Sequence, residues 1–131
     1  MKPVVIGAKG TAEAVADESR LAVTVGSGSL RVYATPMMCA LMEEAACAAI
    51  EDYLEEGETT VGTSLELVHS AATPEGMQVK AEAEIIGVSG REITYSITAF
   101  DEKGEIGRCT HKRVQVGAER FLQKTYSKRN G

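Results

Sequence analysis

Polar and apolar residues alternate along four segments in the second half of the chain, which is the pattern of β-strands with one buried face. The segments span residues 59–71, 77–88, 92–101 and 105–116. Short stretches containing glycine or proline, "ATPEG", "SG" and "EKG", separate them and are typical of hairpin turns. We therefore expect four consecutive strands that pair in an antiparallel sheet.

A long segment that is apolar on most sides precedes these strands, "TPMMCALMEEAACAAIEDYLEEG". Thr35 suits the N-cap of a helix and Pro36 suits its first residue. Gly57 suits the position just after a helix ends. The segment therefore predicts one long helix that continues to Glu55 or Glu56.

Three smaller elements complete the prediction: a strand at residues 11–15, a short helix or turn from the N-cap Asp17 to about Val25, and a terminal helix from Ala118 to about Lys128. A long apolar helix buries its surface when a sheet wraps it. We therefore expect an α+β fold in which an antiparallel β-sheet wraps around a long central α-helix. Because such a sheet leaves open edges, we also expect a homodimer or a higher oligomer joined at an edge.

Length and charge restrict the function. The 131 residues suit one domain, residues 1–131, and the net charge of −5 argues against a nucleic-acid partner. No run of about 18 apolar residues predicts a membrane span, and the N-terminus lacks the apolar stretch of a secretory signal. We expect a cytoplasmic protein without a membrane partner.

The cysteines and histidines give little support to a metal site. Cys39, Cys47 and Cys109 form no CxxC pair and fit reduced thiols in the cytosol. Cys39 and Cys47 lie on the predicted long helix and are interpreted as small core residues. With His69 and His111 as the only histidines, we expect no metal and no other cofactor.

Glu43 is the unusual charge of the predicted helix. Glu44 lies on the wet face of the helical wheel, whereas Glu43 lies about 100° from the centre of that face, in line with Cys47 and Ile50. Burying a charge is costly unless the charge is paired. Glu43 is therefore either a boundary residue that reaches water or a carboxylate kept in a dry cleft for chemistry.

Two further residues are candidates for chemistry. His69 shares the strand parity of Val61 and Leu65, so we expect it to face inward, either as a satisfied core residue or as a proton carrier. Thr35 is explained by helix capping alone. None of these patterns shows that Thr35, Glu43 and His69 meet.

The whole chain resembles a known superfamily. The segments "VGSGSLRVYATP", "ATPMMCALMEEAA", "GTSLELVHSAATP" and "HKRVQV" resemble the hotdog thioesterases, in particular the branch that includes fluoroacetyl-CoA thioesterase. The resemblance covers nearly all of the chain. It implies a hotdog-fold homodimer with active sites at the subunit interface, which hydrolyses a small or short-chain acyl-CoA without a cofactor.

The same resemblance assigns roles to five residues. Thr35, Glu43 and His69 match the catalytic Thr, Glu and His of the family, Gly62 matches a glycine whose backbone lies near the substrate, and Arg113 matches an arginine near the end of the last strand. Glu43 would attack the thioester or activate a water molecule, and Thr35 would act as nucleophile or position Glu43. His69 would carry the proton. Both routes remain open.

Candidate substrate contacts come from one aromatic residue and from several cations. The fluoroacetyl-specific enzyme has an aromatic lid, whereas "GSGSL" has no Phe or Trp, and Tyr33 is the nearby aromatic candidate for substrate binding. The phosphates of CoA require cations, and Lys112 or Arg113 are candidates alongside a basic tail formed by Lys124, Lys128 and Arg129. Each of these charges is equally well explained as solvated surface.

Two other functions fit parts of this pattern. A hotdog hydratase or dehydratase also uses His with an acidic residue, but its motif differs from "ATPxMxxLMEE". A non-catalytic acyl-CoA-binding module is disfavoured because all three catalytic residues are present. The leading interpretation is an acyl-CoA thioesterase.

Overall fold

The computed structural model describes residues 1–131 and contains every predicted element, although the bounds of some elements differ from the prediction. In chain order the elements, with η marking a 3-10 helix, are β1 (Lys9–Val15), η1 (Glu18–Arg20), α1 (Ala22–Val25), α2 (Thr35–Ile50), η2 (Glu51–Tyr53), β2 (Glu58–His69), β3 (Gln78–Ser89), β4 (Glu92–Asp101), β5 (Gly104–Gly117), α3 (Ala118–Tyr126) and η3 (Ser127–Asn130).

The central helix α2 is shorter than predicted and is capped differently. It ends at Ile50 and tightens into the 3-10 turn η2, so the prediction of a helix to Glu55 or Glu56 is wrong. Glu51 and Asp52 place negative charge at a helix C-terminus, where the helix dipole disfavours it. At the other end Ala34 is the N-cap residue, and Thr35 is already helical with no capping bond from its side chain.

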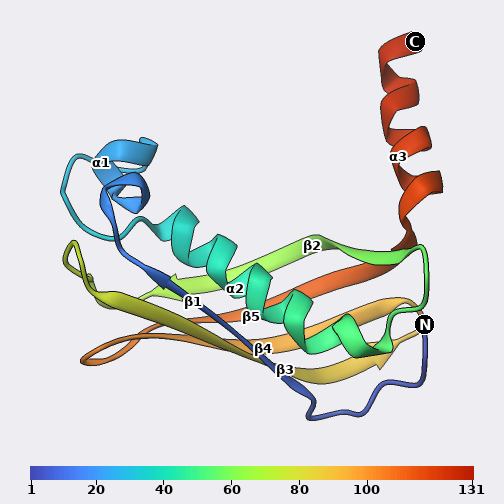
Figure 1. Cartoon of the computed structure of the whole chain (residues 1–131), viewed down its shortest axis with the longest axis horizontal. Helices are drawn as coiled ribbons and strands as arrows, with labels where there is room; N and C mark the ends of the chain where they lie inside the picture. The colour runs from blue at the N-terminus through green and yellow to red at the C-terminus, as the bar shows by residue number, and fades with distance from the viewer.

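The sheet has five antiparallel strands in the order β1-β3-β4-β5-β2, and α2 packs across one face (Figure 1). This arrangement confirms the predicted α+β fold with a sheet around a central helix. β1 and β2 are the two edges, and β2 pairs with β5 on one side while its other side stays open. The free edge of β2 runs over 12 residues.

Small residues let the sheet close tightly around α2. Ala45 and Ala46 are fully buried on the helix, and Ala49 is nearly so. Gly10 of β1 crosses the helix so closely that a Cβ there would lie 2.3 Å from the Ala49 nitrogen. A larger residue at Gly10 would push β1 away from α2.

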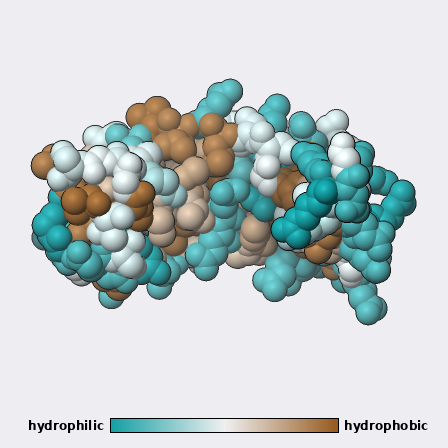
Figure 2. All heavy atoms as spheres, turned by 90° about the horizontal axis from the view of Figure 1, so that it is seen from above, coloured by the Kyte–Doolittle hydropathy of each residue, from teal (hydrophilic) through white to brown (hydrophobic).

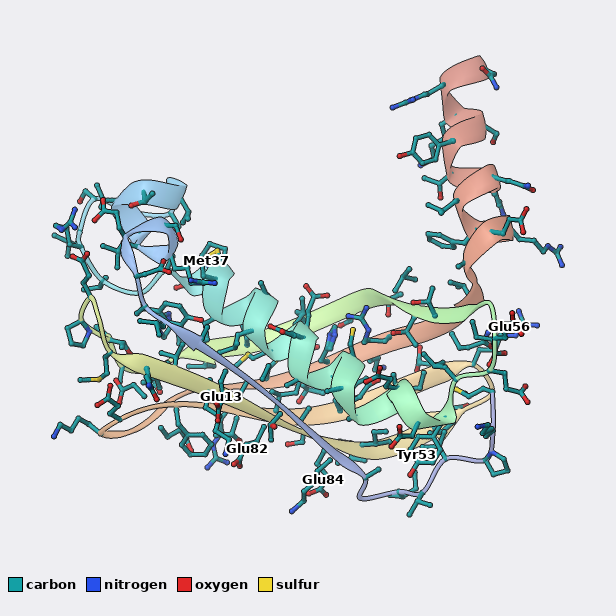
Figure 3. The ribbon with its side chains drawn as sticks, in the orientation of Figure 1. Glu13, Met37, Tyr53, Glu56, Glu82 and Glu84 are labelled. Carbon is teal, nitrogen blue, oxygen red and sulfur yellow. The ribbon has the colours of Figure 1, made fainter.

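The outer face of the sheet is polar, as the alternation predicted. Ala81, Ala83 and Ile85 of β3 are buried against α2, whereas Glu82 and Glu84 point away from the helix (Figure 3). On the helix itself Cys39 is half-buried but Cys47 is exposed, so the interpretation of Cys47 as a core residue is wrong. Its side of α2 is left uncovered by the sheet.

The terminal helix α3 stands away from the body of the molecule. It projects beyond the β2 edge (Figure 1), and its side chains extend into open space on all sides (Figure 3). None of its residues is buried. No helix of the chain is long and apolar enough to cross a membrane.

Candidate active site

The first cluster of the candidate site joins Thr35 to His69. The segment before α2 is fixed on both sides, because the Tyr33 amide donates to the Thr73 carbonyl and the Ala34 amide donates to the Arg20 carbonyl, each at 2.9 Å. This places Thr35 at the first turn of α2. Its Oγ1 lies 2.7 Å from Nδ1 of His69 at the end of β2. The Thr35 hydroxyl therefore serves a side-chain pair rather than a helix cap.

His69 has a free ring nitrogen inside the protein. The residue is half-buried, and its Nε2 is buried without a hydrogen-bond partner. Burial lowers the pKa of His69 below its ordinary value, and the nearby backbone of Ala71 opposes this shift in part. The ring is therefore neutral near pH 7 and able to take up a proton.

A pocket of about 380 Å³ opens beside this pair. Its walls are Ala22, Ser27, Gly28, Ser29, Leu30, Val32, Tyr33, Thr35, His69, Ser70, Ala71 and Ala72. The lining contains no Lys, Arg, Asp or Glu. Tyr33 is almost fully buried, and burial raises the pKa of its phenol to about 12, so it forms a neutral wall of the pocket.

The second cluster holds Glu43. Nη1 of Arg113 donates to Oε2 of Glu43 at 3.0 Å, while its Nε and Nη2 donate to the hydroxyl and the carbonyl of Thr60 at 2.8 and 3.0 Å. Arg113 is buried, whereas 37% of the Glu43 side chain is exposed. Because the guanidinium faces inward, this geometry favours a positioning role for Arg113 over contact with phosphates.

His111 completes the second cluster. Its Nδ1 lies 2.8 Å from the Ser64 carbonyl and must carry the hydrogen, so Nε2 accepts from Nη1 of Arg113 at 3.2 Å. Burial lowers the pKa of His111, which is fully buried and stacked on Tyr95. His111 is therefore neutral and orients the arginine, although its Nε2 lies 4.0 Å from the Glu43 carboxylate.

Sequence reasoning missed His111 and Thr60 as parts of the site. The sequence did contain a signal for His111: it lies two residues before Arg113 in a strand, so both side chains are on the same face, and both are buried. Thr60 carried no such signal, since its role depends on the pairing of β2 with β5.

Gly62 makes room for the carboxylate. A Cβ at Gly62 would lie 2.6 Å from Oε2 of Glu43. The pairing of β2 with β5 shifts register between Gly62 and Ser64. This bulge turns Gly62 to the face of His69 and turns Val61 away, so the predicted shared parity of Val61 and His69 is wrong.

The two clusters lie apart within one chain. Thr35 and Glu43 are separated by eight positions of α2, which corresponds to about 12 Å along the helix axis. His69 and Gly62 occupy opposite halves of β2. The chain therefore brings Thr35 to His69 and Glu43 to Arg113, but it does not bring the two groups together. No cluster of His, Cys, Asp and Glu side chains could hold a metal ion.

Two solved structures that share this architecture are described as thioesterases. The crystal structure of a mutant of the fluoroacetyl-CoA-specific thioesterase FlK matches with a TM-score of 0.90 and 32% identity, covering 98% of this chain and 99% of that chain. A Thermus thermophilus hypothetical protein described as a thioesterase superfamily member matches with a TM-score of 0.89 and 28% identity, covering 98% and 97%. These matches define the class as hotdog-fold thioesterases.

Sequence comparison narrows the class to one family. The fluoroacetyl-CoA thioesterase of Streptantibioticus cattleyicolor is 41% identical over 97 residues, which cover 74% of this chain and 70% of that protein. The model of the family "Fluoroacetyl-CoA-specific thioesterase" matches residues 15–119. The chain belongs to this family. The prediction of an acyl-CoA thioesterase is thereby confirmed.

Proposed function

We propose that this protein hydrolyses the CoA thioester of a small acyl group at a site that two subunits build together. One observation carries the proposal: the three predicted catalytic residues fall into two clusters at opposite halves of a free edge strand. A site that is split in this way becomes complete when the two halves come from different chains.

The free edge of β2 allows such an assembly. If β2 pairs antiparallel with β2 of a second copy, two-fold symmetry requires that a contact from His69 to the partner's Gly62 is repeated from Gly62 to the partner's His69. Residues that lie opposite one another in an antiparallel pair share a face. The bulge after Gly62 puts Gly62 and His69 on the same face, which satisfies this condition.

In this dimer each Thr35–His69 pair faces the partner's Glu43. The exposed part of the Glu43 side chain is available to a partner, because Arg113 engages only its Oε2. The unpaired Nε2 of His69 would face the reacting thioester. We therefore expect two equivalent active sites in each dimer.

The residues divide the work of thioester hydrolysis. Glu43 either attacks the carbonyl carbon, which gives an acyl–Glu43 anhydride that a water molecule then hydrolyses, or it removes a proton from a water molecule that attacks the thioester directly. Arg113 holds the Glu43 carboxylate in place in both routes. The new C–O bond forms as the C–S bond breaks, and the thiolate of CoA leaves with a proton. Neutral His69 first takes up a proton from water and then delivers it to the departing sulfur, while Thr35 holds the imidazole through its hydroxyl.

The pocket favours a small acyl group without selectivity for a fluorinated one. The wall at residues 27–30 supplies two serines, a glycine and a leucine, and Tyr33 is packed into the wall rather than over the opening. No aromatic side chain of this wall covers the substrate. We place the protein in the cytoplasm, acting as a homodimer on acyl-CoA without a cofactor.

A heterodimer tests the shared site. The variants Glu43→Gln and His69→Ala are each expected to be inactive as homodimers. A heterodimer of the two, purified through different tags, has one site with both defects and one site with none. We expect it to recover roughly half of the wild-type kcat per dimer, because one of two equivalent sites is intact.

A site built within one chain would give a different result in this heterodimer. If each chain built its own site, both sites of the heterodimer would carry one defect. A heterodimer no more active than its parents would therefore refute the shared site. The double variant Glu43→Gln/His69→Ala, paired with a wild-type chain, is the matched control: it leaves each shared site with one defect and is expected to be inactive.

A further inference from the structure

The helix α3 has an apolar stripe that nothing in the chain covers. Ala118, Phe121, Leu122, Thr125 and Tyr126 follow the spacing of one helical face. Phe121 is 40% exposed, Leu122 54% and Tyr126 53%. A helix this short is marginal in water without packing, and an exposed apolar stripe usually marks a contact surface. α3 therefore requires a partner surface.

The position of α3 indicates where that surface lies. Gly117, the last residue before α3, pairs with Glu58, the first residue of β2. From there α3 projects beyond the β2 edge, while α1 lies at the opposite end of the molecule (Figure 1). In an antiparallel dimer joined along β2, the Glu58 end of one strand lies next to the His69 end of the other. α3 therefore extends toward the partner's α1 and pocket.

The surface that α3 would reach is also apolar. Val23 and Val25 of α1 are 44% and 39% exposed, and Leu30 in the pocket wall is 67% exposed. Figure 2 looks onto the β2 edge and shows apolar atoms gathered between the two ends of the molecule. Leu30 lines the pocket itself, whereas Val23 and Val25 lie on α1, which begins at the lining residue Ala22.

We propose, on the basis of the shared site, that α3 of each subunit packs its apolar stripe against the partner's Val23, Val25 and Leu30. This contact supports the glycine- and serine-rich wall of the partner's pocket, which has no aromatic lid of its own. Residues 118–131 thus act on the active site of the other subunit.

The charge of α3 suits this position. Arg31, beside the pocket wall, is engaged by Glu18 and Glu75, and the pocket lining itself has no cation. Lys124, Lys128 and Arg129 take part in no ion pair, and the Arg129 guanidinium lies 4.7 Å from the centre of the Tyr126 ring. Docked α3, together with η3 that follows it and carries Lys128 and Arg129, brings these cations to the mouth of a pocket that must receive the phosphates of CoA.

The heterodimer described above tests whether α3 acts across the interface. The one intact active site of this heterodimer combines the pocket of the Glu43→Gln chain with Glu43 of the His69→Ala chain. The helix over that pocket therefore belongs to the His69→Ala chain. We place Leu122→Asp in one chain or in the other, and Gln123→Asp, on the polar face of α3, is the matched control.

Leu122→Asp in the His69→Ala chain is expected to raise KM for acyl-CoA about tenfold, the effect of losing one buried leucine. In the Glu43→Gln chain it should leave KM unchanged, as should Gln123→Asp in either chain. Light scattering checks that the heterodimer stays intact. An equal effect from both chains, an effect only from the Glu43→Gln chain, or no effect would overturn the proposal.

The cations are tested in the same heterodimer. Lys124→Gln, Lys128→Gln and Arg129→Gln together in the His69→Ala chain should raise KM at low salt and weaken its salt dependence. An unchanged KM at low salt would show that Lys124, Lys128 and Arg129 do not contribute to CoA binding. A heterodimer that is inactive without any change in α3 would instead refute the shared site, and this inference with it.

Discussion

Glu43→Gln separates a catalytic role of this carboxylate from a structural one. The substitution keeps the shape of the side chain and its ability to accept the hydrogen bond from Arg113, but it removes the negative charge. A glutamine can neither attack a thioester as a carboxylate does nor take a proton from water. We expect kcat to fall by roughly 10² to 10⁴, the range for a positioned acid or base.

The expected effect on stability is much smaller. Breaking a fully buried ion pair costs about 3–5 kcal/mol because a charge is left unpaired. Here 37% of the Glu43 side chain is exposed, and the glutamine oxygen can still accept from Arg113. Arg113 also keeps both bonds to Thr60 and its contact with His111. We therefore expect a loss of about 1 kcal/mol or less in the free energy of unfolding.

The assay should follow loss of the thioester absorbance. A thiol reagent would also react with Cys47, which is exposed on α2 near Glu43. Glu44→Gln is the control, since Glu44 is exposed and belongs to neither cluster. Urea unfolding of both variants provides the stability comparison.

Two results would contradict the assignment. Equal kcat values for the wild type and Glu43→Gln would show that the carboxylate is not catalytic. A larger loss of kcat in Glu44→Gln than in Glu43→Gln would place the chemistry elsewhere on α2.

Two further predictions follow from the geometry. Gly62→Ala puts a Cβ 2.6 Å from Oε2 of Glu43, so the flexible carboxylate should move while the fold persists. We expect kcat to drop by about 10² with little change in the urea midpoint of unfolding. In the control Gly117→Ala the new Cβ meets no other atom, so neither kcat nor the urea midpoint should change. The lowered pKa values of His69 and His111 mean that the unfolded chain binds more protons, so stability is complete above pH 6.5 and declines as the pH falls below it. The acid limb of kcat/KM should likewise have a midpoint below 6.5, the ordinary pKa of histidine, and a midpoint above it would exclude neutral His69 as the proton carrier.

Local patterns in the sequence determined the elements of the fold. The period-two alternation located β4 at its observed bounds and β3 and β5 to within one residue at each end, because a strand with one wet face imposes that period wherever it lies. The residues around Pro36 predicted the start of α2 for the same reason, since helix entry depends on neighbouring residues. The resemblance of "ATPMMCALMEEAA" to the thioesterases identified the chemistry.

The tertiary structure decided what depends on contacts between distant segments. The bulge after Gly62 turns Val61 to the opposite face of the sheet from the one that the alternation predicted. This bulge arises from the pairing of β2 with β5, so no local sequence pattern predicts it. The sequence alone made Arg113 a candidate for binding a phosphate of CoA. In the folded chain its guanidinium is instead hydrogen-bonded to Thr60 and Glu43. The separation of Glu43 from His69 also arises only when α2 and β2 are packed together. Sequence singled out the candidate catalytic residues, but the packed chain places these candidates in two separate clusters. This separation is the reason to look for the second half of each proposed site in another subunit.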